Sequence, residues 1–276
     1  MKPLVNIASS ASGVVLMVAA LAFPPAAPAA EGHVKLDHAR VDVRDTESLQ
    51  AGARTFVNYC LNCHSASVMR YNRLLDLGLN EDQIKQNLLF TADKVGEMMT
   101  VGMTRKDAKE WFGAAPPDLS VIARTRGADW LYTYLRTFYR DPATLTGWNN
   151  LVFERVAMPH ALWTLQGQPA LEVREFKTLE EAEAAKIQAK SFSVLSEEGE
   201  GGARRHLLKT VRVASAGTLT PAQYDGVVHD LVNFLVWMGE PAQESRKQIG
   251  IVALLFLGLM VLLSWLLYKS YWKDVH

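Results

Sequence analysis

The stretch Cys60-Leu61-Asn62-Cys63-His64 contains the only two cysteines of this chain. Two thiols three positions apart lie close to one helical turn apart, and a histidine follows the second thiol directly. This C-x-x-C-H pattern is typical of covalent haem attachment, in which the thiols bond the two vinyl groups and the imidazole binds the iron. Chance explains the pattern poorly, because 276 residues hold only 2 cysteines and 7 histidines. The stretch predicts one covalently bound haem c, attached at Cys60 and Cys63, with His64 as a metal ligand.

Other chemistries also use paired cysteines. A thiol-disulfide oxidoreductase places its Cys-x-x-Cys pair after a strand in a βαβ frame, and neither is visible before Cys60. A zinc site lacks further ligands, because no other cysteine exists and the remaining histidines are scattered. A disulfide between Cys60 and Cys63 would close too short a loop to stabilise the fold. Haem attachment is favoured, and an exported thiol-disulfide oxidoreductase stands as the alternative from another class.

The sixth iron ligand is expected to be a methionine, the usual partner of histidine in electron-transfer cytochromes c. Met158 lies in a loop, and Pro159 after it favours an extended backbone that presents the sulfur. Met69 follows His64 too closely to reach the opposite haem face, and Met238 belongs to a helical apolar stripe. Met158 is therefore the predicted second metal ligand. The alternatives are the methionine group and the histidine at Met98, Met99, Met103 and His160.

The amino terminus carries an apolar run, residues 13–23, behind Lys2 and ahead of the small residues 26–30. This order predicts a signal peptide over residues 1–30 that is cleaved near Ala29 or Ala30. An uncleaved anchor is the alternative, although the run is about half the ~20 residues that a membrane span needs. Export from the cytoplasm follows from either reading.

The carboxyl terminus carries a second apolar run, Ile249 to Tyr268, which contains no charged residue. At ~1.5 Å per residue it crosses a hydrocarbon core of ~30 Å, so it is a predicted transmembrane helix. Basic residues flank both ends equally, and the signal peptide therefore sets the orientation. Residues 31–245 become a periplasmic haem domain. Residues 246–276 become an anchor in the bacterial inner membrane, with a short cytoplasmic tail.

The region between the two apolar runs predicts three main helices. One begins near Leu49 and continues into the cysteine motif, and Asp129 to Arg140 forms a second, rich in aromatic residues. The third is Pro221 to Met238, where Thr220 is the N-cap, proline takes the first helical position and a glutamine completes a capping box. Its apolar stripe is expected to pack against the first helix at Gly52. The stripe consists of Tyr224, Val228, Leu231, Leu235 and Met238.

The middle of the chain is rich in proline and glycine and reads as loops around a cofactor. Residues 171–190 predict a charged surface helix, and residues 197–202 predict an acidic, glycine-rich loop; neither is assigned chemistry. Acidic and basic side chains are equal in number, 29 each, which argues against nucleic acid as a partner.

Four segments together resemble the cytochrome c1 family. They are Tyr59 to Ser65 followed by Arg70-Tyr71, Gly113-Ala114-Ala115-Pro116-Pro117-Asp118-Leu119-Ser120, Ala157-Met158-Pro159, and Asp230 through Gly239-Glu240-Pro241 into the apolar run. The resemblance implies a mainly α fold, a class I cytochrome c-like haem domain with extended loops plus one C-terminal transmembrane helix. The stretch Gln166 to Gly217 departs from the family pattern, being longer and less regular, which puts partner contacts there in doubt.

The same resemblance implies a function and its partners. The chain would be the haem c subunit of a quinol–cytochrome c oxidoreductase, in a dimeric complex with cytochrome b and the Rieske iron–sulfur protein. It would pass electrons to a soluble or membrane-bound cytochrome c acceptor and contact membrane lipid. Pro117 and Arg126 are implied cofactor-binding residues, the arginine at a haem propionate, with Arg124 as its alternative. A membrane cytochrome that feeds a terminal oxidase or reaction centre is the nearest competing function.

Overall fold

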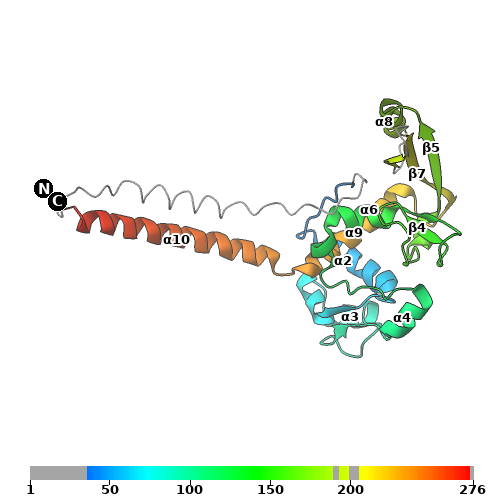
Figure 1. The fold of residues 1–276 in the computed structure, drawn as a ribbon. Coiled ribbons are helices and arrows are strands. Elements are labelled where there is room, and N and C mark those ends of the chain that lie inside the picture. Colours follow the sequence, from blue (N-terminus) through cyan, green and yellow to red (C-terminus); the bar gives the residue numbers. More distant parts are fainter. Residues whose placement is uncertain (1–35, 189–192, 199–204, 274–276) are drawn as a thin grey trace. The chain divides into compact units, whose positions relative to one another are not determined.

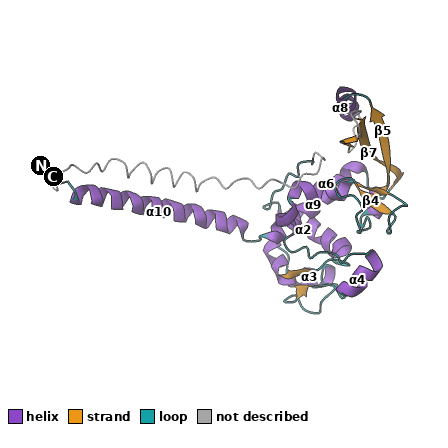
Figure 2. Ribbon diagram, viewed as in Figure 1, coloured by secondary structure: helices purple, strands orange, loops and turns teal. Residues whose placement is uncertain are grey.

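A computed structural model of the protein describes residues 36–188, 193–198 and 205–273, so the predicted signal peptide lies outside the described residues (Figure 1). The helices are α2 (Thr46–Thr55), η2 (Phe56–Cys60, a π-helix), η3 (Tyr71–Leu77, a 3-10 helix), α3 (Glu81–Asn87), α4 (Arg105–Phe112), α5 (Ile122–Arg126), α6 (Ala128–Arg136), α7 (Trp163–Gln166), α8 (Leu179–Gln188), α9 (Pro221–Gly239) and α10 (Gln243–Tyr271). The strands are β1 (Ala66–Arg70), β2 (Met98–Met99), β3 (Phe138–Arg140), β4 (Trp148–Asn150), β5 (Gly167–Phe176), β6 (Ser193–Glu198) and β7 (Arg205–Ala216). Helices predominate, as Figure 2 shows, and the predicted mainly α fold class is confirmed.

Helices α2 and α9 cross in direct contact at the centre of the haem domain (Figure 1). A Cβ atom built on Gly52 would lie 2.0 Å from the Asp230 carbonyl oxygen, so only glycine allows the helices to come this close. One turn further along, the rings of Phe56 and Phe234 pack with their centroids 5.6 Å apart. The predicted packing of these two helices at Gly52 is confirmed.

Helix α9 forms as its sequence predicts. The Thr220 side chain accepts a hydrogen bond from the backbone N–H of Gln223, and the Gln223 side chain accepts one from the backbone N–H of Thr220. All five residues of the predicted stripe are buried. The Tyr224 hydroxyl donates a hydrogen bond to the Leu135 carbonyl oxygen at 2.8 Å. A buried tyrosine that keeps a hydrogen bond lets this face of α9 serve as core.

The second predicted helix, Asp129 to Arg140, is too long. Helix α6 ends at Arg136, and β3 follows as an antiparallel partner of β4. The Asn150 side-chain amide donates to the Tyr134 carbonyl oxygen at 2.7 Å, which takes an acceptor that a continuing helix would use. The buried Thr137 hydroxyl also donates to the Thr133 carbonyl oxygen at 2.9 Å. The side chain of Asn150, from β4, and that of the C-cap residue Thr137 thus complete the end of α6.

The surface helix predicted over residues 171–190 is wrong in its first third. Residues up to Phe176 belong to β5, which pairs antiparallel with β7, and Leu179–Gln188 is helical, while residues 189 and 190 lie outside the described residues. Strand β6 pairs with the other edge of β7, giving the order β5-β7-β6. Side chains of opposite charge face each other between β5 and β7. Arg212 Nε, for example, lies 3.0 Å from a Glu172 carboxylate oxygen. An alternating charged strand and a charged helix have similar compositions, and the pairing partner decides between them.

The acidic loop predicted at residues 197–202 is also wrong at its first two residues, because Glu197 and Glu198 end β6. Residues 199–202 lie outside the described residues.

Helix α10 contains the predicted span 249–268 and begins six residues earlier, at Gln243. The six polar and small residues before the predicted span are therefore helical and continuous with the apolar part. Among the described residues this is the one helix long and apolar enough to cross a membrane, and its apolar side chains are exposed. An exposed apolar helix of this length fits a lipid environment.

Candidate haem site

The cysteine motif forms a tight turn at the end of η2. The backbone N–H groups of Cys63 and His64 both donate to the Cys60 carbonyl oxygen, at 3.1 and 2.9 Å. This turn brings two thiols and one imidazole together from a single short segment. Both cysteines are unbonded and half-buried.

The imidazole of His64 is buried, and one of its ring nitrogens is hydrogen-bonded to the backbone. Its Nδ1 lies 2.7 Å from the Pro117 carbonyl oxygen. A carbonyl only accepts, so Nδ1 donates and Nε2 is the nitrogen left for a metal. Burial lowers the pKa of His64, while the hydrogen bond to Pro117 and the charge of Asp118 act in the opposite direction. A neutral imidazole with one committed nitrogen is the form that binds iron.

The thiols are not poised for disulfide exchange. Burial, and secondarily the neighbouring Cys63, raises the pKa of the Cys60 thiol to about 12. Burial raises the pKa of Cys63 as well. Catalytic thiols of oxidoreductases need a lowered pKa, because the thiolate is the nucleophile. The electrostatics of this turn therefore disfavour the thiol-disulfide alternative.

The predicted sixth ligand, Met158, is half-buried against the main core. The Tyr134 hydroxyl donates to its sulfur at 3.4 Å. The sequence predicted no role for Tyr134, because no local pattern around a tyrosine in a helix indicates a hydrogen bond to Met158, 24 residues away.

The competing methionines lie elsewhere. Met99 pairs with Ala66 and Met98 with Arg70, so both belong to the strand pair that directly follows His64. Met69 lies on β1 and Met238 on α9, and their side chains are 3% and 5% exposed. Met103, the third methionine of the competing group, is half-buried in a loop as Met158 is, but it lies 39 residues after His64, whereas Met158 lies 94 residues after it.

The competing imidazole, His160, is packed among aromatic rings. It stacks on Phe138 with centroids 4.9 Å apart and meets Trp148 edge-on at 5.1 Å. Burial lowers the pKa of His160 to about 4, against the raising effect of Gln166. Its surroundings are those of a neutral core side chain.

The two arginines considered for a haem propionate differ in their surroundings. The Arg124 guanidinium lies 3.6 Å from the Glu240 carboxylate, near the start of the anchor helix. The Arg126 guanidinium lies 5.0 Å from the centre of the Trp130 ring. Within the described part of the chain no carboxylate lies in ion-pair range of Arg126, so its charge remains available for an anionic ligand.

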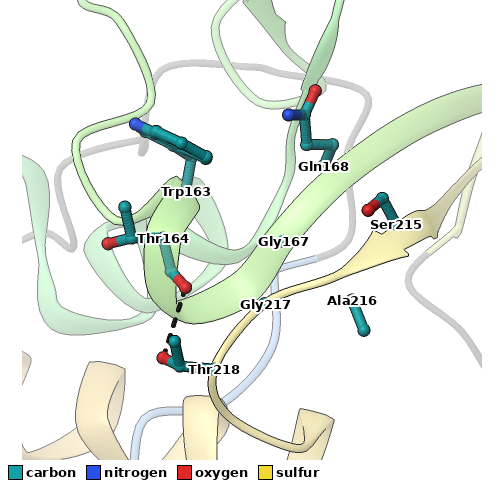
Figure 3. A pocket seen from close by; sticks show the side chains of 8 residues that line it. All are labelled: Trp163, Thr164, Gly167, Gln168, Ser215, Ala216, Gly217 and Thr218. Atoms are coloured by element: carbon teal, nitrogen blue, oxygen red, sulfur yellow. Dashed lines mark hydrogen bonds between the residues drawn. The ribbon is translucent and has the colours of Figure 1, made fainter.

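These residues fit a covalently bound haem c. The two unbonded thiols, the imidazole with Nε2 uncommitted and the half-buried thioether are the donor set that such a group requires. A distinct hollow of about 360 Å³ lies away from the motif, between α7 and the end of β7 (Figure 3). There the Thr218 hydroxyl donates to the Thr164 carbonyl oxygen at 3.2 Å. No charged side chain lines this hollow, and none of its lining residues is a predicted haem-site residue.

The family was tested by comparison with known proteins. The sequence model of the Cytochrome C1 family matches residues 38–186 and 213–275. This chain belongs to the cytochrome c1 family. The match passes over residues 187–212, which include β6 and the first part of β7, so the departure predicted over Gln166 to Gly217 is confined to its middle part.

Relatives with curated names agree with this family along most of the chain. The cytochrome c1 of Allochromatium vinosum is 43% identical over 95% of this chain and 98% of its own length. A protein of Nitrosomonas europaea named ammonia monooxygenase gamma subunit is 47% identical over 95% of this chain and 97% of its own length. The cytochrome c1 of Rhodospirillum rubrum is 29% identical over 84% of this chain and 83% of its own.

Cytochrome c1 is the haem c electron-transfer subunit of the bc1 complex, and this function holds for the present chain. It is a membrane-anchored redox subunit of an oxidoreductase complex, whose partners include cytochrome b and the Rieske protein. The competing functions, a cytochrome that feeds a terminal oxidase and a thiol-disulfide oxidoreductase, are not favoured.

Proposed function

We propose that Cys60 and Cys63 would hold the haem c of this subunit and that His64 and Met158 would supply the protein ligands of its iron. The observation that carries this proposal is the 2.7 Å hydrogen bond from His64 Nδ1 to the Pro117 carbonyl oxygen. It commits one ring nitrogen and leaves the other for iron, directly after the two thiols. Pro117 is therefore proposed as a cofactor-site residue through its carbonyl group.

The chain's residues set the environment of a one-electron centre, and haem c supplies the ferric/ferrous couple. The neutral thioether of Met158 favours the ferrous state and so raises the reduction potential. The Pro117 carbonyl fixes the tautomer of the His64 ring and its orientation. The Arg126 guanidinium, which has no carboxylate partner among the described residues, is proposed to neutralise a propionate.

The membrane topology is proposed from the sequence signals and α10. Residues 1–30 form a signal peptide, residues 31–245 form the periplasmic haem domain, and residues 249–268 span the bacterial inner membrane and contact its lipid. The short tail is cytoplasmic. The exposed apolar surface of α10 supports the span. In this topology a soluble or membrane-bound cytochrome c accepts the electrons in the periplasm, and the whole complex is a dimer.

Replacement of Met158 tests the ligand set. In the purified complex, Met158→Leu is expected to keep the haem attached but lower its reduction potential by about 60 mV or more, a tenfold change in the equilibrium constant. Redox titration of the reduced-minus-oxidised spectrum measures the potential, and a haem stain on a denaturing gel reports covalent attachment.

Met99→Leu is the matched control, because this fully buried methionine belongs to the competing group. It is expected to leave the potential unchanged. A normal potential in Met158→Leu, or a large fall in Met99→Leu, would contradict the proposed sixth ligand.

A further inference from the structure

Several hydrogen bonds join the end of the haem motif and the residues after it to the loop at residues 117–120. The Leu119 N–H donates to the Ser65 carbonyl oxygen at 2.8 Å. The Val68 N–H donates to the Ser120 hydroxyl at 3.2 Å. Together with the bond from His64 to Pro117, these contacts join residues 64–68 to residues 117–120, and we call this set the loop contact.

Asp118 occupies the centre of the loop contact. One carboxylate oxygen accepts the backbone N–H of Ser67 at 2.8 Å, across the contact. The other accepts the backbone N–H of Ser120 at 2.8 Å, within its own turn. The N–H groups of β1 are therefore accepted by side chains of this loop, with Asp118 accepting from Ser67 and Ser120 from Val68.

Asp118 directly follows the residue whose carbonyl group holds the proposed iron ligand His64. Its own backbone nitrogen is bonded covalently to the Pro117 carbonyl carbon, and that carbonyl oxygen is the acceptor for His64 Nδ1. Because the carboxylate fixes both Ser67 and Ser120, it restricts the peptide between Pro117 and Asp118 from either side. A shift of this peptide changes the length and direction of the hydrogen bond to the imidazole.

Burial acts to raise the pKa of Asp118, but the hydrogen bonds from Ser120 and Ser67 outweigh it, and the pKa lies below its usual value. The group is therefore a carboxylate at neutral pH and accepts both backbone N–H groups at full strength.

We propose that Asp118 is a positioning residue for the reduction potential of this subunit, because its carboxylate holds the Pro117 carbonyl against His64. This inference rests on the proposed function, in which His64 is an axial ligand. A firmly held carbonyl makes the imidazole more basic, and the nearby negative charge acts in the same direction. Both effects favour the oxidised state, so loss of the Asp118 carboxylate raises the reduction potential.

The test uses the purified complex with full-length Asp118→Ala and Asp118→Asn subunits. Asp118→Ala removes both acceptors and the charge, and it is expected to change the redox equilibrium at least threefold, a rise of about 30 mV. Asp118→Asn keeps one amide oxygen as an acceptor but loses the charge, so a smaller rise is expected. The g values of the low-spin ferric signal, measured by electron paramagnetic resonance, should shift in the same order.

Asp42→Ala and Asp42→Asn are the matched controls. Asp42 also accepts the backbone N–H two residues on, that of Arg44 at 2.9 Å, but the structure gives its carboxylate no bond to the haem motif. Both control variants are expected to keep the parental potential and g values.

A haem stain separates the inference from the proposal beneath it. If all variants carry covalent haem and the Asp118 variants keep the parental potential and g values, the inference is overturned while the proposed haem attachment stands. An equal rise in the Asp42 variants also overturns it, since the loss of any nearby surface charge would then suffice. Absence of covalent haem in the parent protein overturns both. If Asp118→Ala does not accumulate, the direction of the change in reduction potential in Asp118→Asn alone decides whether the inference stands.

Discussion

The close packing of α2 against α9 at Gly52 predicts a clear loss of stability for Gly52→Ala. A Cβ atom at this position would lie 2.0 Å from the Asp230 carbonyl oxygen and 2.6 Å from the Phe234 Cβ atom. Ordinary contact begins at 3.4 Å, so the first distance is too short by about 1.4 Å. The obstacles are backbone and Cβ atoms, which no side-chain rotation moves aside. The two helices must separate.

The energetic cost follows from that separation. Overpacking of a core costs ~1–3 kcal/mol, and a rigid obstacle places this site at the upper end of that range. A gap of even ~1 Å between packed surfaces loses up to about half of each dispersion contact along the crossing. Alanine returns ~0.5–1 kcal/mol through its better helix propensity. We therefore expect Gly52→Ala to destabilise the haem domain by about 2 kcal/mol, or roughly 4–8 °C in the unfolding temperature of a domain this size.

Gly226→Ala, on α9 of the same helix pair, is expected to raise the stability instead of lowering it. Gly226 is exposed on α9, and a Cβ atom there would meet nothing within 4 Å. This variant should gain ~0.5–1 kcal/mol from helix propensity alone. Thermal unfolding of the detergent-solubilised protein, followed by circular dichroism, measures both changes. If Gly52→Ala raises the unfolding temperature as Gly226→Ala does, the close crossing of α2 and α9 is refuted.

Three further predictions concern charged groups. Arg136→Ala should lower stability by about 2 kcal/mol in denaturant titrations, because it leaves two half-exposed aspartates that this largely buried guanidinium bonds at 2.6 Å each; an unchanged midpoint would contradict this. Asp141→Asn should be less stable than the parent at pH 7, since a hydrogen bond from Asn149 and then a backbone N–H lower the pKa of Asp141. That contribution is present above the unfolded pKa of ~3.9 and is lost as the pH falls through the lower folded pKa, so the difference in unfolding temperature should narrow in acid; a constant difference would refute it. Arg126→Gln should lower the reduction potential by about 30 mV, a threefold change in the equilibrium, while Arg124→Gln leaves it unchanged; the reverse result would assign the propionate contact to Arg124.

Several features could be predicted because they depend on residues close together in the chain. The capping box of Thr220 and Gln223 defines the start of α9 through backbone groups within three residues. The uncharged run from Ile249 to Tyr268 defines a span by its own length and composition. The spacing of Cys60, Cys63 and His64 predicts haem attachment for the same reason, since one turn of chain supplies all three groups.

Other features required partners that are far away in the sequence. Helix α6 ends where an Asn150 side chain takes the Tyr134 carbonyl, a contact over 16 residues. Residues 171–176 of β5 were predicted as part of a helix because their composition suits both states, and the pairing with β7, with Leu171 opposite Val211, makes them a strand. Local propensity differs by ~1 kcal/mol or less between the two states, so pairing and burial decide.

The site divides in the same way. The sequence alone determined that this protein carries a covalent haem c and an apolar run long enough for a membrane anchor, because thiol spacing and an apolar run are local and chemically specific. Tertiary structure decided what surrounds the ligands: the Pro117 carbonyl reaches His64 across 53 residues, and the Tyr134 hydroxyl reaches Met158 across 24. Hydrogen bonds of this kind depend on where whole segments pack, and packing is set by the sum of many weak contacts that no short stretch of sequence contains.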